Sequence, residues 1–183
     1  MCLDGWHNIL EVCAKQFGIT KLKWIVSGGN SGQESIRNGV FNLYKECNPD
    51  DIIIIHDGIR PLINKEVISD CIVVCKEFGN AVSSLPYNEQ IFKTVDGKTS
   101  TEYIPRETLR RVVTPQAYPL QKLYDSYKQA FEKEIGISGS AYTNTMMVEL
   151  GETLHFSAGS DKNIKITTKD DIELFKALIK IEL

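Results

Sequence analysis

The stretch that most constrains the fold is residues 52–61, IIIIHDGIRP, in which four consecutive isoleucines lead directly into polar residues. Successive strand residues point to opposite faces of a sheet, so an unbroken apolar run predicts a strand buried on both faces, as in the centre of a parallel sheet. His56, Asp57 and Arg60 then lie just past the carboxyl end of that strand. Ligands of open α/β sheets bind at this edge, so the three residues are candidates for a binding site.

The segments around this strand alternate between helical and extended patterns. The predicted elements are a helix over 6–16, a strand over 21–27, a helix over 33–47, the strand at 52–55, a helix capped by Asn64 and ended by Gly79, and a strand over 81–86. Short loops between such elements imply right-handed crossovers. We therefore predict a doubly wound, mostly parallel, Rossmann-like α/β sheet with helices on both faces, in a single domain spanning residues 1–183.

Residues 89–106 break this alternation. Two short β-prone runs surround Asp96-Gly97, which is a strong hairpin signal. Because an isolated two-stranded hairpin is marginal in water, we expect this arm, residues 87–110, to pack against a partner subunit in a homodimer.

The C-terminal third is predicted to return to α/β structure. A helix over 119–132 is followed by a Gly/Ser-rich loop at 136–140 and by short strands at 154–159 and 163–167. Thr168 and Asp171 form a capping-box pattern that opens a last helix. Its apolar residues Ile172, Phe175, Ile179 and Leu183 are predicted to face the core.

Charge and composition exclude several classes of protein. The net charge is −3, which gives no general electrostatic reason to bind nucleic acid or an anionic membrane. The five cysteines include no CxxC pair, which argues against a zinc or redox motif. No signal-peptide pattern and no apolar run of 18 residues is visible, so we expect a cytoplasmic protein.

Several charged residues could carry chemistry. Asp57 could bind a divalent cation or a ribose hydroxyl, and Arg60 could bind phosphate, or the two could form a capped surface turn. His56 could act as a base, but a hydrogen-bonded structural role is the more common one. Lys165 lies in an apolar run, where a phosphate would supply its counter-charge, unless it extends from an edge strand into solvent. Arg106 is either exposed or directed toward a neighbouring subunit.

A second candidate site is the turn that contains Gly28, Gly29 and Asn30. Glycines there let backbone amides approach a flat base or a phosphate, and Ser35 adds a hydroxyl in the first turn of the next helix. The pattern is neither a Walker A loop nor a GxGxxG fingerprint, and many ordinary turns look similar.

Five motifs taken together carry a family resemblance. GGNSGQESIRNGV, IIIIHDGIRP, IPRETL, VVTPQAY and GSDKNIKITTKDDIELFKALI resemble, in order and spacing, the 2-C-methyl-D-erythritol 4-phosphate cytidylyltransferases and their relatives that act on ribitol 5-phosphate. The resemblance implies a nucleotidyltransferase that transfers CMP from CTP to a polyol phosphate, releases pyrophosphate and uses Mg²⁺. It also implies a role in making isoprenoids or a surface polymer such as teichoic acid or capsule.

The resemblance also implies residue roles. Gly29, Asn30 and Ser35, with Gly28 beside them, would hold the cytidine end; Asp57 would meet the ribose or the metal; Arg60, Thr114 and Lys165 would face the acceptor phosphate; and Arg106 would act in trans across a dimer.

The sequence departs from the family pattern in several places. Gly32 stands where many members have arginine, Glu89-Gln90 replaces Asp-Thr in the arm, and residues 141–145 replace a Thr-Asp-Asp-like segment. Because the last two regions line the acceptor site in the family, we expect a ribitol-type or other polyol phosphate for a surface polymer at least as much as methylerythritol phosphate. The family's first strand and glycine-rich phosphate loop do not appear, so we expect an N-terminally incomplete domain. Two alternatives stay open: a non-catalytic nucleotide-binding or dimerisation remnant, and a nucleotidyltransferase for another sugar phosphate.

Overall fold

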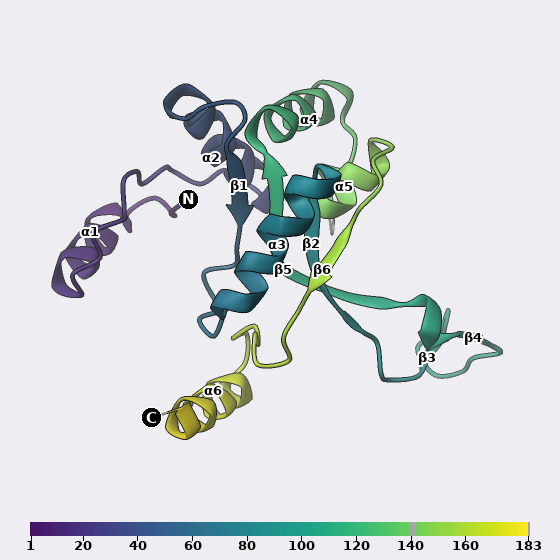
Figure 1. Cartoon of the computed structure of the whole chain (residues 1–183). Helices are drawn as coiled ribbons and strands as arrows, with labels where there is room; N and C mark the ends of the chain where they lie inside the picture. Colours follow the sequence, from purple (N-terminus) through teal and green to yellow (C-terminus); the bar gives the residue numbers. More distant parts are fainter. Residues whose placement is uncertain (140–141, 183) are drawn as a thin grey trace. The chain divides into compact units, whose positions relative to one another are not determined.

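The computed structural model describes residues 1–139 and 142–182 (Figure 1). Contacts divide the chain into two compact units, one formed by Met1–Ile53 with Tyr118–Leu154 and the other by Ile54–Ala117 with His155–Leu183. Among the described residues, no helix is both long and apolar enough to cross a membrane.

The first unit is helical. Its helices are α1 (His7–Gln16), α2 (Gly32–Glu46), α4 (Leu120–Lys133) and α5 (Thr143–Glu149). Helix α2 starts where the Ser31 hydroxyl accepts a hydrogen bond from the Glu34 amide at 3.1 Å, an N-cap that satisfies one free donor of the first turn. Helices α2 and α4 pack side by side (Figure 1), with Tyr44 and Tyr124 stacked at a centroid distance of 3.9 Å.

A buried polar network ties three of these helices together. The Tyr127 hydroxyl on α4 donates to the Gln33 side-chain carbonyl on α2 at 2.9 Å and bonds the Thr143 hydroxyl on α5 at 2.7 Å. Gln33 in turn donates to the carbonyl of Gly136 at 2.8 Å. Burial raises the pKa of Tyr127 well above its usual range, so its hydroxyl stays protonated and available as a donor.

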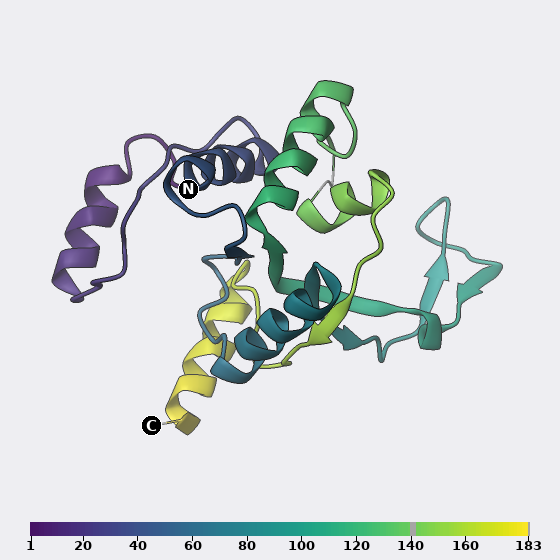
Figure 2. The same cartoon turned by 45° about the horizontal axis from the view of Figure 1, so that its top comes forward.

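The second unit contains most of a mixed sheet, of which the first two residues of β1 and the last two of β5 belong to the first unit. Strands β1 (Ile52–Ile55), β2 (Ala81–Pro86), β5 (Arg110–Pro119) and β6 (Phe156–Ala158) lie in the order β1-β5-β2-β6. Strand β2 pairs antiparallel with β5 and parallel with β6. Helix α3 (Lys65–Phe78) covers β2 and β6, as Figures 1 and 2 show, and helix α6 (Lys169–Glu182) closes the chain.

The core of this unit lies between α3 and the sheet. The buried residues there are Val67, Cys71, Cys75, Ala81, Val82, Val113 and Ala117. Helix α3 begins at Asn64, whose side chain accepts from the Val67 amide at 2.9 Å, and ends at Gly79, whose φ of 81° is a left-handed conformation that glycine adopts without strain. Both ends of α3 are therefore as predicted.

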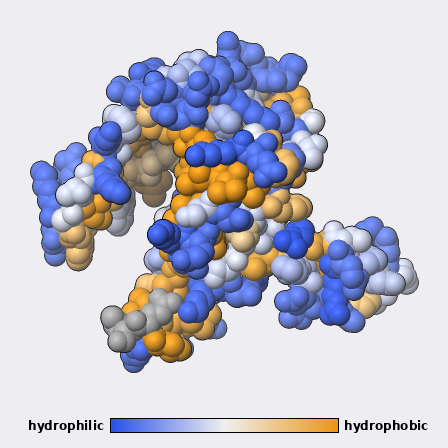
Figure 3. Space-filling view, in the orientation of Figure 1, coloured by the Kyte–Doolittle hydropathy of each residue, from blue (hydrophilic) through white to orange (hydrophobic). Residues whose placement is uncertain are grey.

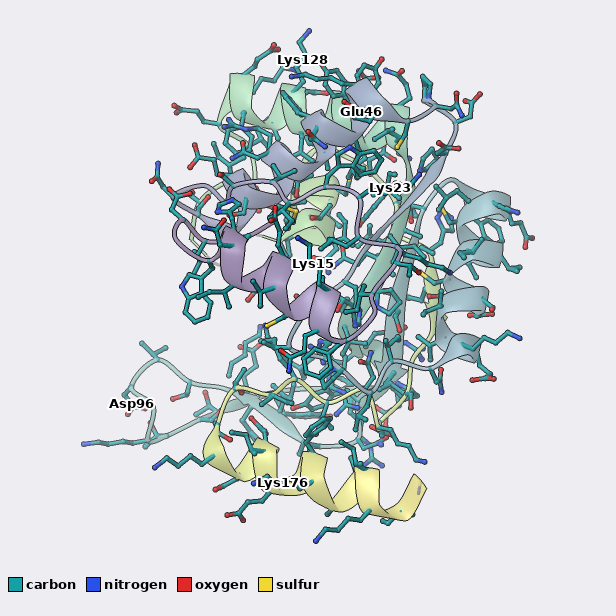
Figure 4. All side chains as sticks on the ribbon, turned by 90° about the vertical axis from the view of Figure 1, so that its left-hand side faces the viewer. Lys15, Lys23, Glu46, Asp96, Lys128 and Lys176 are labelled. Atoms are coloured by element: carbon teal, nitrogen blue, oxygen red, sulfur yellow. The ribbon has the colours of Figure 1, made fainter. Side chains whose placement is uncertain are left out.

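The hairpin arm extends away from the sheet of its unit (Figure 1). Strands β3 (Ile91–Lys93) and β4 (Glu102–Ile104) pair antiparallel, and the short helix η1 (Arg106–Thr108) follows. The connection spans residues 94–101, longer than a two-residue turn, and is organised by Asp96, which Figure 4 labels at the tip of the arm. The Asp96 carboxylate accepts from the amides of Lys98 and Thr99, and these bonds lower its pKa.

The predicted α/β class and the strand at 52–55 are confirmed, but two other strand predictions and the central place of this strand were wrong. Residues 21–27 form no strand beyond a single bridge between Ser27 and Cys2, because Cys2 is the only described backbone that pairs with them. Residues 163–167 form no ladder. Besides local turn bonds at Asn163 and Ile164, they make one bond to a distant described backbone, from Ile166 to Ile59 at 2.9 Å. Strand β1 is at the edge of the four-stranded sheet, so its isoleucines are half-buried rather than central and buried.

Two elements had no prediction, and the last helix is more exposed than expected. Strand β5 and helix α5 were not predicted as such. Helix α6 begins with the predicted capping box between Thr168 and Asp171, but Ile172 is 42% exposed and Phe175 and Ile179 are only half-buried. Apolar surface on α6 is visible in Figure 3.

Residues 140, 141 and 183 lie outside the described residues. The predicted loop at 136–140 is therefore seen only as far as residue 139, where it forms no helix or strand. The segment 141–145 is seen from Tyr142, and the predicted burial of Leu183 is not tested.

Candidate functional site

The polar residues that follow β1 form a compact charged cluster in the second unit. A tight turn bonds the Arg60 amide to the Asp57 carbonyl at 3.0 Å, which folds the Arg60 side chain back onto the Asp57 carboxylate. Arg60 Nε donates to Asp57 Oδ2 at 3.0 Å, and Lys165 Nζ lies 3.8 Å from the same oxygen. Two cations thus share one carboxylate oxygen, which leaves the cluster with one excess positive charge.

Thr114 and His56 fix the backbone of this turn. The Thr114 hydroxyl, on β5, accepts a hydrogen bond from the Asp57 amide at 3.1 Å and lies 3.2 Å from His56 Nδ1. His56 Nε2 lies 3.0 Å from the carbonyl of Arg60. A carbonyl can only accept, so the partners assign the proton to Nε2, and in the neutral ring Nδ1 accepts from the Thr114 hydroxyl. His56 is therefore hydrogen-bonded on both ring nitrogens.

A residue that was not predicted as part of the site completes the cluster. Asn163 is 3% exposed, and its side-chain amide donates to the Thr114 carbonyl at 2.7 Å. The backbone carbonyl of Asn163 accepts from Arg60 Nη1 at 2.9 Å. Its Oδ1 is buried and has no partner among the described residues. The only indication in the sequence is its position two residues before Lys165.

The exposure of the cluster decides what it can bind. The Arg60 side chain is 12% exposed and is held by fixed acceptors, whereas Lys165 and Asp57 are 36% and 34% exposed. A guanidinium in a fixed orientation and a neighbouring ammonium are suited to an oxyanion such as a phosphate. The structure therefore brings Arg60, Thr114 and Lys165 together with Asp57.

The glycine turn forms a second polar site, in the first unit. The Gly29 amide donates to Ser35 Oγ at 2.9 Å, and the Asn30 amide donates to Glu34 Oε2 at 2.6 Å. A Cβ added to Gly29 would lie 2.6 Å from Cβ and Cγ of Glu34, and at Gly28 it would lie 3.2 Å from Ser35 Oγ. The two glycines thus allow the turn to lie directly on the first turn of α2, where Ser35 supports it.

A cavity of about 580 Å³ opens beside this turn. It is lined by Leu3, Asp4, Trp6, Gly28, Gly29, Asn30, Glu34 and Asn38. An indole ring, backbone groups and a few polar side chains are the usual lining of a site for a small planar ligand. Gly28, Gly29 and Asn30 were predicted here, whereas Trp6, Glu34 and Asn38 were not.

Arg106 lies on the hairpin arm, where its side chain is exposed. Its Nη1 donates to the Asn88 carbonyl at 3.2 Å and its Nε lies 3.5 Å from Glu107. In the described part of the chain, no hydrogen bond or ion pair links Arg106 with the Asp57 cluster. Within one chain, Arg106 is therefore not brought together with the other predicted catalytic residues.

The metal prediction for Asp57 rests on a single carboxylate. No group of three His, Cys, Asp or Glu side chains is placed to hold a metal ion within residues 1–139 and 142–182. Both cations contact Asp57 Oδ2, and in the same residues Oδ1 has no hydrogen bond or ion pair. Asp57 can therefore offer one oxygen, and a metal there would need its other ligands from a substrate or water.

Comparison with known proteins decides the family. The model of the family "2-C-methyl-D-erythritol 4-phosphate cytidylyltransferase" matches residues 11–180. The chain belongs to this family. Within it, the chain is 56% identical over 180 residues to a ribitol-5-phosphate cytidylyltransferase of Lacticaseibacillus paracasei, which covers 98% of this chain and 77% of that protein.

A second relative and a solved structure extend the comparison. A 2-C-methyl-D-erythritol 4-phosphate cytidylyltransferase of Alkaliphilus oremlandii is 32% identical over 174 residues, covering 94% of this chain and 69% of that protein. Among solved structures, 4-diphosphocytidyl-2C-methyl-D-erythritol synthase of Anaerococcus prevotii matches with a TM-score of 0.80 at 19% identity, covering 97% of this chain and 78% of that one. This structural likeness confirms the predicted fold.

Proposed function

We propose that this cytidylyltransferase-family protein transfers CMP from CTP to ribitol 5-phosphate and releases pyrophosphate. The 56% identity with a ribitol-5-phosphate cytidylyltransferase supports the choice of acceptor. The single observation that carries the chemistry is the pairing of Arg60 and Lys165 with one oxygen of Asp57, because it provides a cationic site for a phosphate.

The cluster suits the acceptor phosphate. An oxygen of this phosphate attacks the α-phosphorus of CTP in line, a P–O bond forms, and the bond to the bridging oxygen of the β-phosphate breaks as pyrophosphate leaves. No covalent enzyme intermediate is needed, so the protein contributes positioning and charge neutralisation. Arg60 and Lys165 hold the acceptor phosphate, and Thr114 lies beside them.

The glycine turn suits the cytidine. The backbone of this turn, residues 28–30, lies at the edge of the cavity. Hydrogen bonds to Ser35 and Glu34 fix the turn on helix α2. The indole of Trp6 offers a stacking surface for a base. A preference of this site for cytosine is supported by the family membership.

Mg²⁺ is proposed to arrive with the triphosphate. Mg²⁺ in nucleotide sites is usually held by one or two carboxylates together with substrate phosphates, and Asp57 Oδ1 provides one such oxygen. When bound, the ion neutralises charge on the phosphates. Asp57 also orients Arg60 and Lys165 through Oδ2.

A homodimer formed through the arm is proposed as the working unit. Phe92 and Tyr103 on the arm are 57% and 67% exposed, and a cavity of about 420 Å³ lies among them and Arg106. Exposed aromatic residues on an extended arm are suited to burial against a second copy of the chain. Arg106 would then reach the acceptor site of the partner.

The test is pyrophosphate release from CTP with ribitol 5-phosphate, compared with 2-C-methyl-D-erythritol 4-phosphate. It should be run on the 183-residue chain and on the chain extended by any in-frame upstream residues. Faster release with ribitol 5-phosphate in either form is expected. Release only with methylerythritol phosphate would overturn the acceptor, and none with any polyol phosphate would favour a non-catalytic nucleotide-binding protein.

A further inference from the structure

Asn163 stands out in the cluster of Asp57, Arg60, Thr114 and Lys165, called the acceptor cluster below, because it bonds both the backbone at Thr114 and the side chain of Arg60. It is 3% exposed, and it bonds the Thr114 carbonyl through its side chain and the Arg60 guanidinium through its backbone. His56 and Asp57 also link Thr114 with Arg60, but they do so through the Thr114 hydroxyl, whereas Asn163 holds the Thr114 backbone carbonyl.

We propose that Asn163 is the positioning residue of the acceptor phosphate site. Its side-chain amide holds the β5 backbone at Thr114, its carbonyl holds Arg60, and it precedes Lys165 by two residues, so one residue sets the spacing of three phosphate-binding groups. This inference rests on the proposed function of the cluster as the acceptor phosphate site.

The hydrogen bonds explain why the contact is specific for asparagine. The partner of the side chain is the Thr114 carbonyl, which can only accept, so the position needs a donor. Aspartate has the same shape but would place a carboxylate oxygen against that carbonyl. It would also add a negative charge beside Arg60 and Lys165, where the phosphate must bind.

The segment around Asn163 shows why a side chain is needed to fix it. Residues 163–167 belong to no strand. The amides of Asn163, Ile164 and Thr167 make only local bonds, and the one bond to the backbone of a distant described segment runs from Ile166 to Ile59. Without the Asn163 side chain, the position of Lys165 relative to Arg60 would depend on the bond from Ile166 to Ile59 and on the bond from Arg60 to the Asn163 carbonyl. A shift of about 1 Å in a positioned group can cost about 100-fold in rate.

The variants are Asn163→Ala and Asn163→Asp, with Asn80→Ala as a matched control. Asn80 is also an asparagine in the second unit, is 1% exposed, and likewise anchors a loop, by accepting from the His155 amide at 2.9 Å. Its bond to His155 lies outside the acceptor cluster. Losses of general stability should therefore be similar for Asn80→Ala and Asn163→Ala, as measured by thermal unfolding.

The measurement is calorimetric binding of ribitol 5-phosphate, together with KM for this acceptor and for CTP. We expect both Asn163 variants to weaken acceptor binding by about 10- to 100-fold while the KM for CTP changes less than threefold, and Asn80→Ala to leave both unchanged. Asn163→Asp should bind ribitol 5-phosphate no more tightly than Asn163→Ala does.

Three results would overturn the role of Asn163. They are unchanged acceptor binding in Asn163→Asp, equal weakening for acceptor and CTP, and the same acceptor loss in Asn80→Ala. Because binding is read directly, a chain that binds ribitol 5-phosphate in an Asn163-dependent way but releases no pyrophosphate would support this inference and refute the proposed reaction. A chain that binds no ribitol 5-phosphate would refute both.

Discussion

At the scale of single residues, Lys165 is the most exposed cation of the acceptor cluster and the one with the weakest tie to Asp57. Replacing it by methionine keeps the aliphatic length and removes the charge. We predict that Lys165→Met lowers kcat/KM for the acceptor by about 100- to 1000-fold, because one donor to a phosphate or oxyanion is lost. Steady-state kinetics with varied acceptor checks this, and Lys169→Met, an exposed lysine four residues on, should have wild-type kinetics.

A second prediction at this scale concerns the effect of replacing Gly29 on CTP binding. In Gly29→Ala, the new methyl group would meet Cβ and Cγ of Glu34 at 2.6 Å, so the turn must move away from α2. We predict that the Kd for CTP rises about tenfold or more, which calorimetry measures. Gly32→Ala is the matched control, because no atom lies within 4 Å of a Cβ at Gly32, and CTP binding there should not change.

The charged residues of the candidate site could be predicted from the sequence, whereas the residues that hold the surrounding backbone in place by hydrogen bonds could not. Asp57, Arg60 and Lys165 carry charge next to apolar runs, which marks them in any sequence. Asn163 and Glu34 act through hydrogen bonds to backbone groups that come from other segments or depend on the turn geometry. Such bonds are decided by the fold, so one sequence alone does not indicate them.

At the scale of elements, helix α6 depends on its N-terminal cap. Hydrogen bonds from the Thr167 and Thr168 amides to the carboxylate lower the pKa of Asp171 to about 2. The folded-state pKa lies below the ordinary value of 3.8, so the stabilisation from this carboxylate is complete above pH 3.8 and is lost as pH falls toward 2. We predict that α6 loses its first turn in this window.

Amide hydrogen exchange or NMR of residues 169–172 between pH 5 and pH 2 would detect this loss. Asp171→Asn should loosen the same turn already at pH 5 and remove most of its pH dependence. Asp170→Asn, at the adjacent exposed position, should behave like the wild type. A first turn that stays protected at pH 2 in the wild type would contradict the prediction.

The elements also show why some strand predictions failed. Residues 21–27 and 163–167 both have apolar, β-branched patterns, but a strand also needs a partner backbone along its length. Among the described residues, only Cys2 pairs with the backbone of 21–27. Apart from local turn bonds, only Ile59 pairs with the backbone of 163–167. The helix predictions were more accurate because the backbone hydrogen bonds of a helix lie within the helix itself. The bounds of α2, α3 and α4 lie within a residue or two of the predicted ones.

At the scale of the whole molecule, the α/β class could be predicted from the alternation of helices and strands and the family from five motifs in one order, whereas the sheet topology could not. The antiparallel pairing of β2 with β5 depends on how the chain returns from the hairpin arm, and no local pattern encodes that return. Likewise, Arg106 is marked by its motif, but no contact within the described chain places it at the acceptor site. We therefore predict that its function depends on assembly.

The assembly can be tested with mixed dimers of Arg106→Ala and Lys165→Ala chains. If Arg106 acts on the partner's site, one site of each mixed dimer keeps its own Lys165 and receives an intact Arg106, while the other site lacks both. We predict that each parent dimer is nearly inactive and that the mixed dimer recovers about half of the wild-type rate of pyrophosphate release, measured on dimers co-purified through two different tags. Size-exclusion chromatography of Arg106→Ala should still show a dimer, because the residue is expected to contact substrate rather than to hold the arm. If Arg106 acted within its own chain, both sites of the mixed dimer would lack one residue, and no activity would return.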